Sequence, residues 1–220
     1  MELSVVLVVN QNDPSIFNPD FLRHNNIVDA NLSVREQAIS TPVFSQVSFQ
    51  DGLVVKADPE RVIFEQAGNP LDPRTVHCPA SAAQFVQQFP HFLYKAVGIN
   101  PKGIRVLAGD AVQNIMLSNA LHNNGEWLSF QDTEPEIQLK AVYHFEKRVI
   151  SLDVAKIQRL NNDRDNDVGI LFQANIHRDL GEIEQRMRSE QILTIISSWK
   201  DDLTDFSTLV EKFQFGSVES

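Results

Sequence analysis

The stretch IQLKAVYHF, residues Ile137–Phe145, is the clearest fold signal in the chain, because apolar and polar residues alternate along it. The same alternation recurs in VGILFQANI, residues Val168–Ile176. Side chains two positions apart on a strand share a face, so each stretch predicts a strand with one face in a core. A third strand is predicted between them, within Val149–Leu160.

The last long stretch, Ile192–Phe213, predicts a long C-terminal helix. Its apolar residues recur at alternating steps of four and three, which is typical of a helix that keeps one apolar seam against a neighbour. The seam positions are Ile192, Ile196, Trp199, Leu203, Phe206, Val210 and Phe213. The residues between them, Asp202 and Asp205 included, are predicted to form a polar outer side. We expect this helix to cover the apolar faces of the strands at 137–145 and 168–176.

The first half of the chain contains a hairpin signal. Two β-rich runs, Val43–Gln50 and Leu53–Ala57, flank Asp51-Gly52, a pair that suits the positive φ angles of a type I′ turn. The run Leu3–Val9 is apolar on both faces, which predicts a central strand or a strand at a subunit contact.

Helices are predicted at two further places. Ser81–Phe89 is amphipathic and stops at Pro90, and Asp110 is a suitable N-cap for a helix that reaches Leu121. Between these helices, the prolyl segment Asn100–Gly103 is predicted to bend the chain and to separate two extended stretches.

Runs of strands joined by short turns favour antiparallel pairing. We therefore predict an α+β fold with predominantly antiparallel sheet, helices packed on one face and the long C-terminal helix. Each half of the chain has a strand pair, a further strand and then a helix, which suggests the hypothesis of two similar halves. Residues 1–220 are interpreted as a single globular domain, with a subdomain boundary near 68–74 where two prolines fall close together.

Composition narrows the class of protein. A chain of 220 residues with 42% hydrophobic content can bury a sizeable core. The net charge of −10, from 19 basic and 29 acidic residues, argues against nucleic acid as a ligand. No apolar run is long enough for a membrane span, and Cys78 is the one cysteine. We therefore expect a cytoplasmic protein with no membrane partner and no internal disulfide.

A histidine pair is the strongest metal candidate in the sequence. The alternation places His144 and His177 on the strand face opposite the core, with Glu146 beside His144 and Asp179 beside His177. Two imidazoles and two carboxylates could bind zinc or iron if the strands adjoin. No short histidine motif supports this site, so we expect a solvated sheet face and no metal.

Cys78 and His77 are weak catalytic candidates. A thiol at a helix N-terminus beside an imidazole can act as a nucleophile, although a free cysteine is more often buried. Neither a phosphate-binding glycine motif nor a Gly-x-Ser-x-Gly elbow occurs, so no cofactor is expected and an enzyme is disfavoured.

These observations favour a noncatalytic module that binds a protein partner or a second copy of itself. The alternative is a small-molecule-binding protein or enzyme with a cavity between the sheet and the final helix, with Tyr143 and Trp199 among its lining residues.

Overall fold

One nine-stranded antiparallel sheet carries the fold of the computed structural model, which describes residues 1–68, 75–107, 136–159 and 167–213. The strands in chain order are β1 (Glu2–Val9), β2 (Ile39–Ser40), β3 (Ser45–Ser48), β4 (Leu53–Asp58), β5 (Arg61–Ala67), β6 (Tyr94–Leu107), β7 (Gln138–His144), β8 (Val149–Arg159) and β9 (Asp167–Asp179). Their order across the sheet is β2-β3-β4-β5-β1-β6-β9-β8-β7. The predicted α+β class and antiparallel pairing are confirmed.

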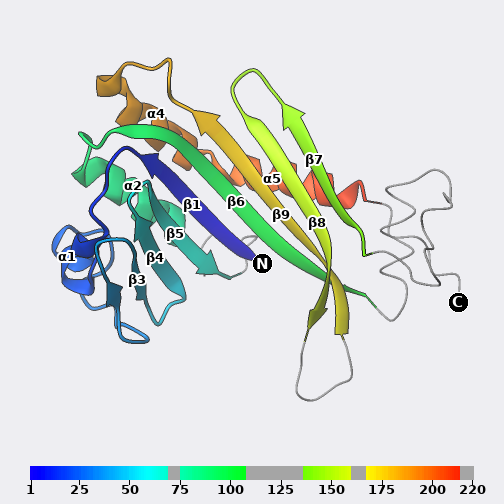
Figure 1. Cartoon of the computed structure of the whole chain (residues 1–220), viewed down its shortest axis with the longest axis horizontal. Helices are drawn as coiled ribbons and strands as arrows, with labels where there is room; N and C mark the ends of the chain where they lie inside the picture. The colour runs from blue at the N-terminus through cyan, green and yellow to red at the C-terminus, as the bar shows by residue number, and fades with distance from the viewer. Residues whose placement is uncertain (69–74, 108–135, 160–166, 214–220) are drawn as a thin grey trace, which may run out of the picture.

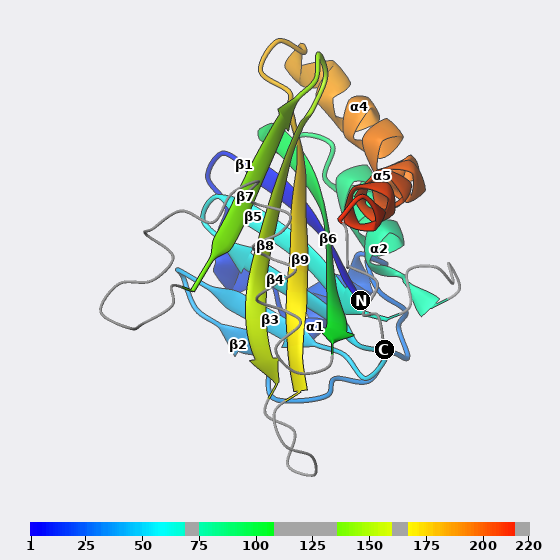
Figure 2. The same ribbon diagram turned by 90° about the vertical axis from the view of Figure 1, so that its right-hand side faces the viewer.

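Helices gather on one face of this sheet (Figures 1 and 2). They are η1 (Pro14–Ile16), α1 (Pro19–His24), α2 (Cys78–Gln88), α4 (Gln185–Ser197) and α5 (Trp199–Glu211). Helix α2 packs on β1 and β5, α4 packs on α2 and β6, and α5 lies over β6 and β9. The opposite face of the sheet carries no helix among the described residues.

Strand β1 lies at the centre of the sheet, between β5 and β6. Its odd-numbered residues face the helices, and Leu3, Val5 and Leu7 are fully buried there. Its even-numbered residues, Val6 and Val8 among them, are half-buried on the other face. The prediction of a central strand is confirmed, and pairing on both sides leaves β1 with no free edge for a subunit contact.

The alternating stretches of the second half form β7, β8 and β9 as predicted. On β9 the residues Ile170, Phe172 and Ile176 point into the core with at most 1% exposure. Strand β8 pairs with β9 and with β7, so the three strands form one continuous ladder. The helix-facing side of this ladder is the surface that α5 covers.

The two halves of the sheet have the same layout. β1 and β6 pair antiparallel at the centre, and outward from them come β5, β4 and β3 on one side and β9, β8 and β7 on the other. Each half ends in a helix, α2 or α4, and these two helices pack against each other. The similarity of layout agrees with the hypothesis of two similar halves, and an origin by duplication stays a hypothesis.

The C-terminal region is a pair of helices, so the prediction of one continuous helix was wrong. The break falls at Ser198, which ends α4 and precedes α5. The Ser197 hydroxyl donates to the Thr194 carbonyl at 2.7 Å, and the Ser198 hydroxyl donates to the Ile195 carbonyl at 3.0 Å. Hydroxyls that bond the preceding turn are a common cause of helix kinks. All seven predicted seam positions are nevertheless buried or half-buried.

The hairpin at Asp51-Gly52 joins β3 and β4 as predicted, but its turn type was wrong. Gly52 has a φ of +89°, whereas Asp51 is not among the residues with positive φ, and a type I′ turn requires both. The amide of Gly52 donates to the Phe49 carbonyl at 3.2 Å. A glycine in the left-handed region after a tight turn is the arrangement of a bulged hairpin.

The bend predicted at Asn100–Gly103 was also wrong, because β6 runs straight through it. Pro101 has no amide hydrogen, and the pairs of β6 with β9 skip Asn100 and Pro101 between Ile99–Ile176 and Lys102–Gln173. The partner strand β1 still pairs with Pro101, so the strand continues. The helix predicted over 110–121 and most of the boundary near 68–74 lie outside the described residues.

Within the described parts of the chain, none of the helices is long and apolar enough to cross a membrane.

Candidate functional site

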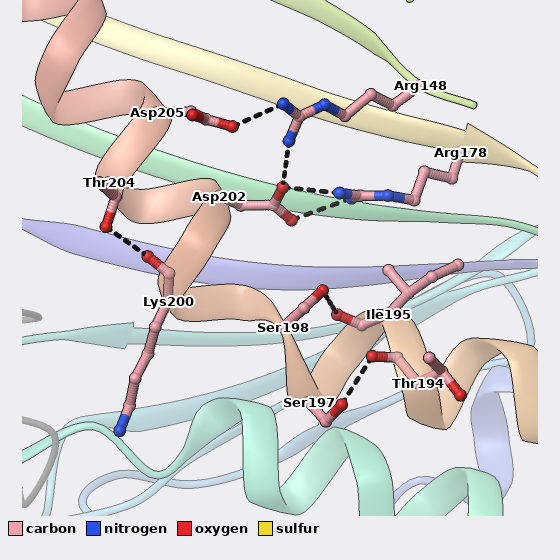
Figure 3. A network of polar contacts seen from close by, with 10 residues as sticks. All are labelled: Arg148, Arg178, Thr194, Ile195, Ser197, Ser198, Lys200, Asp202, Thr204 and Asp205. Carbon is pink, nitrogen blue, oxygen red and sulfur yellow. Dashed lines mark hydrogen bonds and ion pairs between the residues drawn. The ribbon is translucent and has the colours of Figure 1, made fainter. Parts of the chain in front are cut away.

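The sheet edge formed by β7, β8 and β9, together with the helices above it, holds most of the candidate residues. Strand alternation positions the side chains of the sheet, and the kink between α4 and α5 positions those of α5. Even-numbered residues of β8 and β9 face the helices, so Arg148, immediately before β8, and Arg178, on β9, point toward α5. Asp202 and Asp205 in the first turns of α5 point back at them (Figure 3).

These four residues form a charged network. Arg178 donates to both carboxylate oxygens of Asp202, with Nη1–Oδ2 at 2.9 Å and Nη2–Oδ1 at 2.6 Å. Arg148 donates through Nη1 to Asp202 Oδ1 at 3.0 Å, and its Nη2 lies 2.6 Å from Asp205 Oδ2 (Figure 3). The Arg148 guanidinium also lies 5.2 Å from the centroid of the Phe145 ring. The network therefore links the β7–β8 turn, β9 and α5.

Asp202 is the most deeply placed member, since its side chain is 1% exposed. A carboxylate removed from water is tolerated only when it is paired and hydrogen-bonded, and the two-point contact with Arg178 supplies this. The sequence-based assignment of Asp202 to the polar outer side was therefore wrong. Both arginines occupy even-numbered positions, as do the buried apolar residues of β8 and β9. This shared parity was the signal in the sequence that a buried anion lies opposite them.

A groove of about 690 Å³ opens beside this network. It lies between the β7–β8 turn, the segment that links β9 to α4, and the α4 helix. Three of the predicted metal candidates, Glu146, His177 and Asp179, line it together with Lys147 and Arg148. Both acidic and basic groups line the groove, so it presents no field of a single sign to a charged ligand.

The predicted histidine pair shares a face and a cross-strand row. His144 pairs with Val149, and Val149 pairs with His177, so the two imidazoles belong to strands about 10 Å apart. The side chain of Val149 stands between them. Among the described residues, no group of three or more His, Cys, Asp or Glu side chains is arranged to hold a metal ion.

Cys78 is the first residue of α2 and is fully buried. Its thiol donates to the Leu3 carbonyl at 3.4 Å, and burial raises the pKa of the thiol far above its ordinary value. The adjacent His77 is exposed. Both backbone amides donate to the side-chain oxygen of Gln66, at 2.5 Å from His77 and 3.1 Å from Cys78. Gln66 thus caps the helix, and the thiol packs as a small apolar group.

A second, smaller groove, called the edge groove here, lies between the sheet and the end of α5. Its volume is about 370 Å³, and its lining residues are Leu139, Lys140, Ala141, Tyr143, Leu152, Val154, Leu209, Lys212 and Phe213. Tyr143 therefore lines a space between the sheet and the final helix. Trp199 does not line this space, because it is the first residue of α5, at the other end of the helix, where it is 9% exposed.

Strand β7 forms one edge of the sheet, and large apolar side chains are exposed along and just beyond it. Val142 is 45%, Tyr143 39% and Phe145 52% exposed. In the described part of the chain β7 pairs with β8 alone, so its outer side has no partner strand among these residues. An edge of this kind can accept another strand.

Comparison with known proteins gives no further guide, because no protein-family model matches the sequence and the search of curated proteins returns no match.

Proposed function

We propose that this protein is a noncatalytic binding module that associates with a second copy of itself through strand β7. The observation that supports this proposal is the exposure of Val142, Tyr143 and Phe145 on and beside an edge strand of seven residues. Strand addition uses two elements, the row of backbone amides and carbonyls along such an edge and the apolar side chains beside it.

The opposite edge of the sheet provides a contrast. Strand β2 has two residues, which is a common way to keep an edge from pairing with another chain. Strand β7 has no such protection in its length. Its single charged residue, Lys140, lies 3.6 Å from Asp153 on the neighbouring strand and is thus engaged within the sheet.

Two β7 strands are compatible in antiparallel register. A pairing centred on Ala141 places Leu139 of one copy opposite Tyr143 of the other, and Lys140 opposite Val142. Aromatic–aliphatic pairs across strands are stabilising, and no like charges oppose each other in this register. The contact is its own complement, as a twofold interface requires.

Sedimentation equilibrium of the whole chain over about 1–200 μM tests this proposal, because standard twofold interfaces dissociate within or below this range. The wild-type chain is expected to form a dimer. Val142→Lys is expected to convert it to a folded monomer, since residue 142 is exposed and a lysine on an edge strand discourages pairing.

Val43→Lys is the matched control, because Val43 is 70% exposed in the turn between β2 and β3 at the other edge. This variant is expected to remain a dimer. A wild-type chain that stays monomeric throughout the range would refute self-association, and loss of the dimer in Val43→Lys alone would assign the contact to the opposite edge.

A second candidate function is the binding of a small molecule between the sheet and the final helix. The edge groove supports it, because its volume falls within the usual range for small-molecule sites, about 300–1,000 Å³. Its lining is also mainly apolar, as is typical of such sites.

A further inference from the structure

The walls of the edge groove are apolar and come from three elements. Leu152 and Val154 of β8 form a floor and are each 2% exposed. Leu139 and Ala141 of β7 form one side, and Leu209 with Phe213 at the end of α5 forms the other. The Phe213 ring meets the ring of Phe172 edge-on, with centroids 5.3 Å apart, which anchors that side to the sheet. The walls suit a hydrocarbon chain.

The charged groups of the edge groove are of one sign. Lys140 and Lys212 line it, and none of its described lining residues is Asp or Glu, although acidic residues outnumber basic ones by 29 to 19 in the chain. Lys140 is engaged with Asp153, whereas Lys212 is exposed and makes no ion pair within the described residues. Within the described residues, the rim therefore offers one ammonium group without an ion-pair partner next to apolar walls.

Tyr143 adds a second polar group to the rim. It lines the groove and is 39% exposed, so its hydroxyl is available to donate a hydrogen bond while its ring extends the apolar wall. An ammonium and a phenolic hydroxyl are both donors, and both stabilise an oxygen-bearing anion.

We propose that the edge groove binds a carboxylate with a hydrocarbon chain of medium length, as in a fatty acid. The chain lies on Leu152 and Val154, and the carboxylate accepts hydrogen bonds from Lys212 Nζ and the Tyr143 hydroxyl. This inference rests on the second candidate function and is independent of pairing through β7. The groove lies at the small end of the range for ligand sites, which limits the ligand to a single chain.

Lys212 is the residue on which the anion preference depends. It is the C-cap of α5, and the last carbonyls of a helix carry partial negative charge that disfavours an anion nearby. The ammonium of Lys212 offsets this charge. Without it, the groove remains apolar but should prefer a neutral or positively charged head group.

Isothermal titration calorimetry of the whole chain with decanoate, decanol and decylamine tests the proposal. Decanoate is expected to bind most tightly. Lys212→Glu is expected to weaken decanoate binding by at least about tenfold, the loss of one charge-assisted hydrogen bond, and to make decylamine the preferred ligand. Because Lys212 is exposed, the variant should keep the wild-type melting temperature.

Lys200→Glu is the matched control, since Lys200 is an exposed lysine on the same helix and does not line the groove. Its decanoate affinity should stay within about twofold of wild type. Equal loss in both variants would overturn the proposal, because it would show a general effect of net charge.

Two further outcomes distinguish the binding of apolar ligands from the preference for a carboxylate. If decanol and decanoate bind equally and Lys212→Glu changes neither, the groove binds apolar ligands and the carboxylate assignment is wrong. If none of the three compounds binds, the carboxylate assignment and the second candidate function both fail.

Discussion

The two halves of the sheet share a strand order but are held to their helices by different chemistry. In the first half, aromatic rings join η1, α1 and α2 to the sheet. The rings in contact are those of Phe17, Phe21, Phe64, Phe85, Phe89, Phe92 and Tyr94, with centroids 5.0 to 6.1 Å apart. In the second half, the buried carboxylate of Asp202 and two arginines join α5 to the sheet.

This difference shows that the same strand layout can be combined with apolar packing in one half and with directional charge pairing in the other. The aromatic cluster is stabilised mainly by the non-directional hydrophobic effect, and it lies over β5 and β1, in the half whose outer edge is the short strand β2. The charged network is directional, so it sets where the start of α5 sits over the sheet, and Arg148 and Arg178 also line the larger groove. The edge with the exposed apolar residues belongs to this second half, and both proposed binding surfaces lie there.

Removal of the central ring of the aromatic cluster should have the largest effect. Phe85 is fully buried and contacts four other rings, so Phe85→Ala should destabilise the protein by roughly 3 to 5 kcal/mol. Urea unfolding followed by circular dichroism measures the change. Phe44→Ala, at a ring that is 37% exposed, is the control and should cost less than about 1 kcal/mol. Equal costs would mean that the cluster contributes no more than a surface ring.

Loss of the buried carboxylate should have the next largest effect. Asp202→Asn leaves Arg178, whose side chain is 13% exposed, without a counter-charge and should cost about 3 kcal/mol. Arg148 is 25% exposed and still pairs with Asp205 in this variant. The expected loss of stability is therefore at the lower end of the range for broken buried ion pairs. The same unfolding experiment applies, with Asp201→Asn at the exposed neighbouring position as the control. A cost below about 1 kcal/mol would show that water screens the network.

An ion pair on the open face of the first half should have the smallest effect. Lys56 Nζ lies 3.0 Å from Glu65 Oε2, and both side chains are more than a quarter exposed. A double-mutant cycle with Lys56→Met and Glu65→Gln should give a coupling free energy of about 0.5 kcal/mol, which falls further in high salt. A coupling as large as the cost of Asp202→Asn would remove the distinction between the two halves.

Local patterns in the sequence predicted most of the strands and α2. The alternation in β7, β8 and β9 predicted both the strands and their buried faces, because a half-buried strand must alternate. Pattern reasoning was wrong at Pro101, where pairing with β1 continues the strand, and at Ser198, where two hydroxyls bond the preceding turn of the helix. It was wrong in turn type at Asp51-Gly52, since a dipeptide fits more than one hairpin geometry.

The candidate site was predicted only in part. Tyr143 was identified as a lining residue and does line the edge groove, and the shared face of His144 and His177 followed from strand parity. The network of Arg148, Arg178 and Asp202 was not predicted. Charged residues are mostly exposed, so the sequence pattern alone assigns them to the surface. Burial of such a group depends on partners that are distant in sequence.

The amino-acid sequence was enough to predict which apolar residues of each strand and helix face a core, since that follows from the period of the backbone and the cost of exposing apolar surface. It also determined the antiparallel pairing of neighbouring strands through short turns. The folded structure was needed to learn which strands lie at the edges of the sheet and which charges meet. These depend on contacts between residues far apart in the chain, such as Asp202 with Arg148, and no local pattern encodes them.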